Sequence, residues 1–166
     1  MPTSADINNY YIGKGTLSWT PEGGVLRDLG NVPEFELTPD LEKLAHFSSR
    51  AGIRKKDREV VISQSVALRL ILEEWTIDNL QMALMGGTIT TNTFDIFAVS
   101  ELRGQINFIG TNDVGPQIDI VLPLVSFTPS GSINPLSDDW AGLELTGEVL
   151  SVGGVFGTLT HRDVVV

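Results

Sequence analysis

The 166-residue sequence contains no cysteine. Disulfide bonds and thiolate metal sites are therefore excluded. Aromatic residues make up only 7% of the chain, and no apolar run approaches the roughly 20 residues that a membrane-spanning helix needs, so we expect no membrane insertion. The opening "MPTSADINNYY" lacks the charged and apolar regions of a secretory signal, and we expect no export signal there.

Positive charge is also scarce, since 11 Lys and Arg stand against 21 Asp and Glu and the formal net charge is -10. A protein that binds nucleic acid by neutralising phosphates normally has the opposite balance. The few cations are concentrated, because five of them lie in "HFSSRAGIRKKDR" at 46–58 and no lysine follows Lys56. An acidic chain with one short basic segment suggests a specific use for that segment.

The sequence lacks the residue patterns of common catalytic and ligand sites. Its two histidines, His46 and His161, have no paired metal-ligand spacing. No nucleophile-elbow pattern surrounds Ser48 or Ser49, and "GKG" at 13–15 is not a phosphate loop. We therefore predict no catalytic residues, no cofactor and no metal site.

Alternation of apolar and polar residues dominates the rest of the chain and is typical of strands with one buried face. "VALRLILEEW" at 66–75 puts its leucines on one face, opposite Arg69 and Glu73. "QIDIVLPLVSF" at 117–127 groups Leu122 and Leu124 with its isoleucines, and "GLELTGEVL" and "EFEL" alternate in the same way. Further expected strands are "GTLSW", "EVVISQS", "TFDIFAVSE" at 93–101 and "RGQINFIGT".

One segment, "TIDNLQMALMGG", has helical spacing instead. Thr76 is a candidate N-cap, and the Gly86-Gly87 pair is a candidate left-handed stop. We predict a single domain, 1–166, that is mainly β: an antiparallel β-sandwich or partly closed barrel with one short α-helix at about 76–85 and a long loop at about 46–58. Pro123 inside a strand pattern predicts a sheet edge or a bulge.

An ordered series of segments carries a family resemblance. "YIGKG" is followed by "GGVLRDLGNVPEFELTP", "LEKLAHFSSRAGIRKKD" and "LEEWTIDNLQMALMG". This series, which runs through Gly86, resembles the N-terminal half of tail tube (major tail) proteins of long-tailed bacteriophages, relatives of type VI secretion tubes. The resemblance implies a β-sandwich subunit without catalytic residues. Its hexameric rings would stack into the hollow tube that conducts DNA into the host.

The resemblance also implies partners and a location. The partners would be further copies of the chain, a tape measure protein, a tail terminator and baseplate or distal tail proteins. DNA would pass through the lumen without specific binding. The subunit would assemble in the bacterial cytoplasm and reside in the virion tail.

In that family a long loop after the early strands reaches the neighbouring ring and subunit, and residues 46–58 occupy its position. We expect the loop to be mobile in a free subunit and ordered in the tube. Apolar anchors and cations would meet an apolar and acidic surface of the next ring. The candidate contact residues are Phe47, Ser48, Arg50, Ile53, Arg54, Lys55, Lys56 and Arg58.

Acidic side chains on the polar faces of strands would suit the lumen, because DNA would not adhere to them. The candidates are Glu34, Glu36, Glu144 and Glu148. The outer wall of the tube and the subunit contacts are competing locations for the same side chains.

Other functions remain open at this point. One is a type VI secretion-like tube protein, which neighbouring genes for a tape measure and a terminator would argue against. Another is a β-sandwich accessory protein that binds a host or a carbohydrate, for which exposed aromatic or calcium-binding clusters would be the sign. A third, a small hydrolase, has no recognisable site.

Overall fold

The computed structural model describes residues 5–163. Within them lie eight strands, one α-helix and a short 3-10 turn at Ile7–Asn9. The strands are β1 Gly15–Pro21, β2 Arg27–Asp28, β3 Glu34–Phe47, β4 Lys56–Leu72, β5 Leu102–Gly110, β6 Gln117–Pro129, β7 Leu143–Val149 and β8 Thr158–Arg162, and the helix α1 is Ile77–Ala83. All strand pairs are antiparallel. The prediction of a mainly β, antiparallel fold with one short helix is confirmed.

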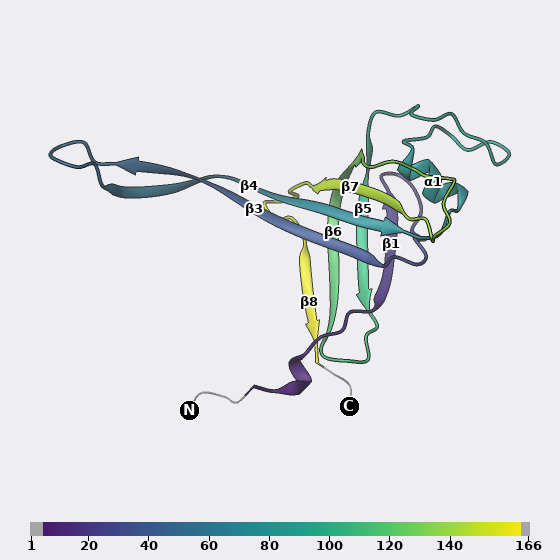
Figure 1. Cartoon of the computed structure of the whole chain (residues 1–166), viewed down its shortest axis with the longest axis horizontal. Coiled ribbons are helices and arrows are strands. Elements are labelled where there is room, and N and C mark those ends of the chain that lie inside the picture. Colours follow the sequence, from purple (N-terminus) through teal and green to yellow (C-terminus); the bar gives the residue numbers. More distant parts are fainter. Residues whose placement is uncertain (1–4, 164–166) are drawn as a thin grey trace.

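All eight strands belong to one sheet, in the order β2-β1-β5-β6-β7-β4-β3, with β8 paired to β6 beside this path. Strand β6 is shared, since residues 117–121 pair with β8 and residues 125–129 pair with β7. The sheet folds over at this point, so β3, β4 and β7 run across β1, β5 and β6 (Figure 1). Among the described residues β2 and β3 remain at opposite ends of the strand order, so the sheet does not close into a barrel.

The core lies between the two halves of the folded sheet. The leucines of β4 at 68, 70 and 72 are all at most 2% exposed, which confirms the predicted alternation of that strand. Strand β7 alternates in the same way, with Leu143 and Leu145 buried. From the other half, Trp19 of β1 packs edge-on against Phe127 of β6, with ring centres 5.0 Å apart.

A bulge in β6 changes which side its residues face. Opposite Gln105 of β5 the register shifts, and β6 has two residues there, Pro123 and Leu124. This confirms the bulge expected from Pro123, which has no N–H to donate to a ladder. After the bulge Val125 is fully buried, whereas Leu124 lies outside the core. The prediction that Leu124 shares the face of Leu122 is therefore wrong.

Helix α1 matches the predicted segment to within two residues at each end. Thr76 caps its first turn, as expected. The left-handed residue at its end is Met85, with φ 49°, and not the glycine pair. The next N–H, that of Gly86, donates to the carbonyl five residues back, which closes the helix with a Schellman motif. Gly86 is required for another reason, because a Cβ there would overlap the ring of Phe94.

Residues 93–101 do not form the predicted strand. The chain reverses at Thr91 and Asn92, both of which have positive φ, and Phe97 also has φ 55°. The Phe97 N–H donates to the carbonyl of Leu84 at 2.9 Å, so the segment bonds to the end of α1 instead of to a sheet. The carbonyls at the end of a helix have no partner within the helix and need donors, which explains why residues 93–101 bond there.

Candidate functional site

The hairpin of β3 and β4 extends far beyond the rest of the sheet (Figure 1). Strand β7 pairs with β4 only over residues 66–72. Beyond that point, residues 40–65 form a two-stranded ribbon, which we call the arm. All of its residues are exposed except Ala45 and Ser48, which are half-buried. Because an isolated two-stranded ribbon is only marginally stable in water, the arm needs cover from elsewhere.

The prediction of a long loop at 46–58 needs a correction of its bounds. Strand β3 extends into this segment as far as Phe47, and β4 begins within it at Lys56. Only residues 48–55 lie outside the strands. The ribbon continues further than expected because cross-strand pairs support it, among them the ion pair of Lys43 with Glu59 at 2.9 Å. The loop itself turns at Gly52, whose φ is 63°.

Apolar side chains are exposed along the arm. Leu41, Leu44, Val60, Val61 and Ile62 are each between 40% and 60% exposed. Three successive apolar residues at 60–62 place apolar groups on both faces of a strand, a pattern typical of strands covered on both sides. Each such side chain contributes about 1.5–3 kcal/mol when it is fully buried.

The predicted contact residues gather at the end of the arm. Phe47 and Ile53 are exposed there, Ile53 to 89%. Lys56 is paired with Glu59 within the arm. The other four cations, which form no ion pair among residues 5–163, are Arg50, Arg54, Lys55 and Arg58. The end of the arm therefore combines free positive charge with exposed apolar groups.

The four glutamates predicted for a lumen lie on one face of the sheet. Glu34 and Glu36 are on β3, and Glu144 and Glu148 are on β7, in each case alternating with residues that face the core. Strand β4 runs between them and places Arg69 directly beside Glu36 in the register. We call this surface the acidic face.

Arg69 is the centre of the acidic face. Its Nε donates to Glu144 at 2.9 Å, a terminal nitrogen lies 3.5 Å from Glu36, and the same nitrogen bonds to Glu34. The hydrogen bonds to Glu144 and Glu34 raise the pKa of Arg69 above its usual value, so this cation stays charged. Three carboxylates share one cation, and the surface remains negative.

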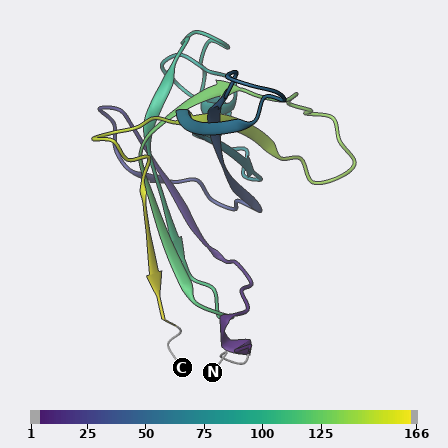
Figure 2. The same ribbon diagram turned by 90° about the vertical axis from the view of Figure 1, so that its left-hand side faces the viewer.

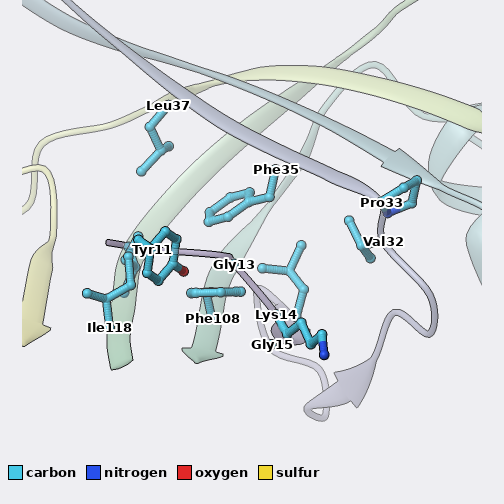
Figure 3. Close-up of a pocket in the computed structure, with 12 residues that line it drawn as sticks. Tyr11, Gly13, Lys14, Gly15, Val32, Pro33, Phe35, Leu37, Phe108 and Ile118 are labelled. Carbon is cyan, nitrogen blue, oxygen red and sulfur yellow. The ribbon is translucent and has the colours of Figure 1, made fainter. Parts of the chain in front are cut away.

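An apolar cleft of about 340 Å³ opens between β3 and the other half of the sheet (Figure 3). Its walls include Phe35 and Phe108, whose ring centres are 5.7 Å apart. Tyr11 and Lys14 border it, and Lys14 is the one charged residue among those that line it.

A second groove of about 470 Å³ lies at the α1 end of the molecule, which is opposite the end of the arm (Figure 1). Its apolar lining includes Trp19, Met82 and Leu102, and two carboxylates, Asp78 and Glu101, also line it. We call it the α1 groove. The loop between β6 and β7 stands out from the body (Figure 2).

Arg27 also lines the α1 groove, where its guanidinium is hydrogen-bonded to α1. It donates to the side-chain oxygen of Asn79 at 2.6 Å and to the carbonyl of Asp78 at 3.2 Å. Burial lowers the pKa of Arg27 from its usual value, and the charge of Asp78 opposes that shift.

Residues 5–163 contain neither a metal-binding cluster nor a membrane-spanning helix. No group of three His, Asp or Glu side chains in this part of the chain could hold a metal ion. No helix in it is long and apolar enough to span a bilayer.

Sequence reasoning missed the apolar surface of the arm and the α1 groove. The run "VVI" at 60–62 was the available signal for the arm, because it interrupts the alternation. The α1 groove had no signal, because residues from β1, α1 and β5 meet there only after folding.

The comparison with curated proteins gives no match. A family model with the description "Protein of unknown function UCP028589" matches residues 10–98. The matched region includes the arm, α1 and the segment that follows the helix. It covers more than half of the 166 residues, so the chain belongs to this family.

Proposed function

We propose that this chain is a structural subunit that assembles with its own copies into stacked hexameric rings and forms the tail tube of a bacteriophage. The tube would guide DNA from the capsid into the host. The proposal rests on the resemblance of the N-terminal half to tail tube proteins and on the surfaces described above.

The arm is the observation that carries the proposal. It is long, projects from the body and exposes apolar side chains that water does not stabilise. Within the arm, residues 40–65, both long edges of the ribbon have backbone groups that pair with no other described strand, and such edges readily pair with another chain. A subunit with this feature is suited to assembly, since a neighbouring copy would supply the missing cover.

The acidic face supports the second part of the proposal. In a tube it would line the lumen, where DNA must slide without adhering. The four glutamates of this surface outnumber its two cations, Arg69 and Arg103, so the surface stays net negative and would repel the DNA backbone. The tape measure, terminator and distal tail proteins would be the further partners.

Electron microscopy and sedimentation of the purified chain over a range of concentrations test the proposal. We expect rings or tubes of uniform diameter, alone or with the initiating partner proteins. The matched control lacks residues 41–64 and joins Asp40 to Ser65 through Asn-Gly, a turn that suits a hairpin. These two residues are register partners, so the body should still fold, but the variant should not assemble.

Two results would contradict the proposal. One is a wild-type chain that stays monomeric in the presence of those partners. The other is a variant without the arm that forms the same rings and tubes as the full chain.

A further inference from the structure

The end of the arm and the α1 groove lie at opposite ends of the longest dimension of the molecule (Figure 1). The arm of one copy therefore reaches the groove of another copy more readily than its own. A contact between two different surfaces of identical subunits is head-to-tail, and it generates either a closed ring or an open filament.

The charges of the two ends are complementary. Residues 46–58 contain five Lys or Arg and one acidic residue. Residues 73–101 contain no Lys, Arg or His and five acidic residues: Glu73, Glu74, Asp78, Asp95 and Glu101. All five are exposed, and among residues 5–163 only Glu101 forms an ion pair, with Arg103. Opposite potentials of this kind steer association and select one register.

The apolar parts are complementary as well. Ile53 is 89% exposed at the end of the arm, and Arg54 and Lys55 follow it directly. The α1 groove has an apolar lining that includes Met82, with Asp78 beside it. The charged residues that line the groove are Asp78, Glu101 and Arg27, which together are net negative, and Arg27 is bonded to Asn79 and to the Asp78 carbonyl. An apolar side chain flanked by cations thus matches an apolar groove with a net negative lining.

The other two recesses fit the end of the arm less well. The apolar cleft has Lys14 as the one charged residue among those that line it, and Lys14 is paired with Asp113 at 3.2 Å, so no carboxylate lines this cleft to attract the basic loop. The recess of the acidic face, about 480 Å³, is lined by Arg69 and Arg103 as well as by Glu36 and Glu148, so its charges do not favour a basic loop.

We infer that the α1 groove of one copy binds the arm of a second copy, with Ile53 in the groove and Arg54 and Lys55 near Asp78. This inference names the acceptor of the arm, so it rests on the self-assembly proposed above. The acceptor surface is made by residues from β1, α1 and β5 together with the segment that precedes β5.

Site-specific cross-linking tests the inference, because the chain has no cysteine of its own. Ile53→Cys protein is mixed with Thr88→Cys protein, whose cysteine lines the α1 groove, and oxidised with diamide. Matched partners carry Tyr11→Cys at the apolar cleft or Thr146→Cys on the acidic face. The rate of mixed disulfide formation is read from non-reducing gels.

We expect the disulfide with Thr88→Cys to form at least tenfold faster than with either matched partner. Adding Arg54→Glu and Lys55→Glu to the Ile53→Cys chain should remove most of this preference. Adding Asp78→Lys to the Thr88→Cys chain should restore part of it. A disulfide bond requires close approach of the two Cβ atoms, so the preference reports on docking and not on mere collision.

Equal rates with the three partners, or a faster reaction with Tyr11→Cys or Thr146→Cys, would overturn the inference. Microscopy of the same samples separates this failure from that of the proposed function. Rings or tubes without the Thr88 preference would refute only the acceptor site. The Thr88 preference without rings or tubes would support the head-to-tail contact and count against the tail tube.

Discussion

Replacing Leu70 by alanine should destabilise the isolated subunit by about 2–5 kcal/mol. Leu70 is 0% exposed and lies between Phe35 of β3 and Leu145 of β7 in the strand register. Neighbours on both sides hold the backbone in place, so the lost atoms leave a cavity that the core cannot easily fill. In a chain of this size 1 kcal/mol shifts the Tm by about 2–4 °C, which predicts a fall of roughly 4–20 °C.

Leu44→Ala is the matched control, because this leucine lies on the same hairpin but in the arm, 60% exposed. Its effect on the subunit should stay within about 0.5 kcal/mol. Thermal and urea unfolding at a concentration where the chain is monomeric measure both changes. An unchanged unfolding midpoint for Leu70→Ala, or equal losses for the two variants, would refute the assignment of the core.

Three further substitutions test local structure by the same unfolding measurements. Gly104→Ala should cost about 1–3 kcal/mol, because a Cβ would overlap the backbone carbonyl of Thr20 and lie 2.7 Å from the Trp19 ring, and an unchanged midpoint would contradict this packing. Asn79→Leu should cost about 1–3 kcal/mol, since Arg27 and two backbone carbonyls would lose their partner, and a neutral effect would show that water replaces it. Thr91→Asn should stabilise the chain by up to about 1 kcal/mol, because asparagine tolerates the left-handed conformation better, and a loss would argue against that turn.

The parts of the fold that follow from local pattern could be predicted from the sequence. The leucines of β4 alternate with polar residues over the length of the paired strand, and Thr76 precedes a segment of helical spacing. Both signals depend on residues that are close in the chain. The bulge at Pro123 was predictable for the same reason, since the missing N–H is a property of that residue.

Other parts depend on tertiary pairing and could not be predicted. Strand β8 has one large apolar residue, Leu159, which is 61% exposed, so its sequence gives little strand signal. It is a strand because β6 offers it a free edge over residues 117–121. Residues 93–101 show the reverse case, since their apolar alternation predicted a strand while their N–H groups bond to the end of α1.

Of the candidate surfaces, too, one follows from local sequence pattern and another depends on tertiary pairing. The acidic face could be predicted because Glu34 and Glu36 alternate with Phe35 and Leu37 along one strand. The length of the arm could not, because it depends on where β7 stops pairing with β4, and that point lies far away in the sequence.

Arg69 allows three carboxylates of the acidic face to lie close together in a stable subunit, because it is paired with all three. Arg69→Gln keeps a hydrogen-bonding side chain but removes the one charge that Glu34, Glu36 and Glu144 share. The three carboxylates would then repel one another. The screening length falls from about 30 Å at 0.01 M salt to about 3 Å at 1 M, so salt should relieve the repulsion.

The Tm of Arg69→Gln should therefore lie below that of the wild type at 10 mM NaCl, and the difference should shrink at 1 M. Arg58→Gln is the control, because Arg58 forms no ion pair within residues 5–163, and its effect should be small at both salt concentrations. A loss for Arg69→Gln that is equal at both salt concentrations would indicate lost packing instead of charge. A Tm that does not change at low salt would show that the carboxylates do not need the arginine, and the electrostatic account of the acidic face would be wrong.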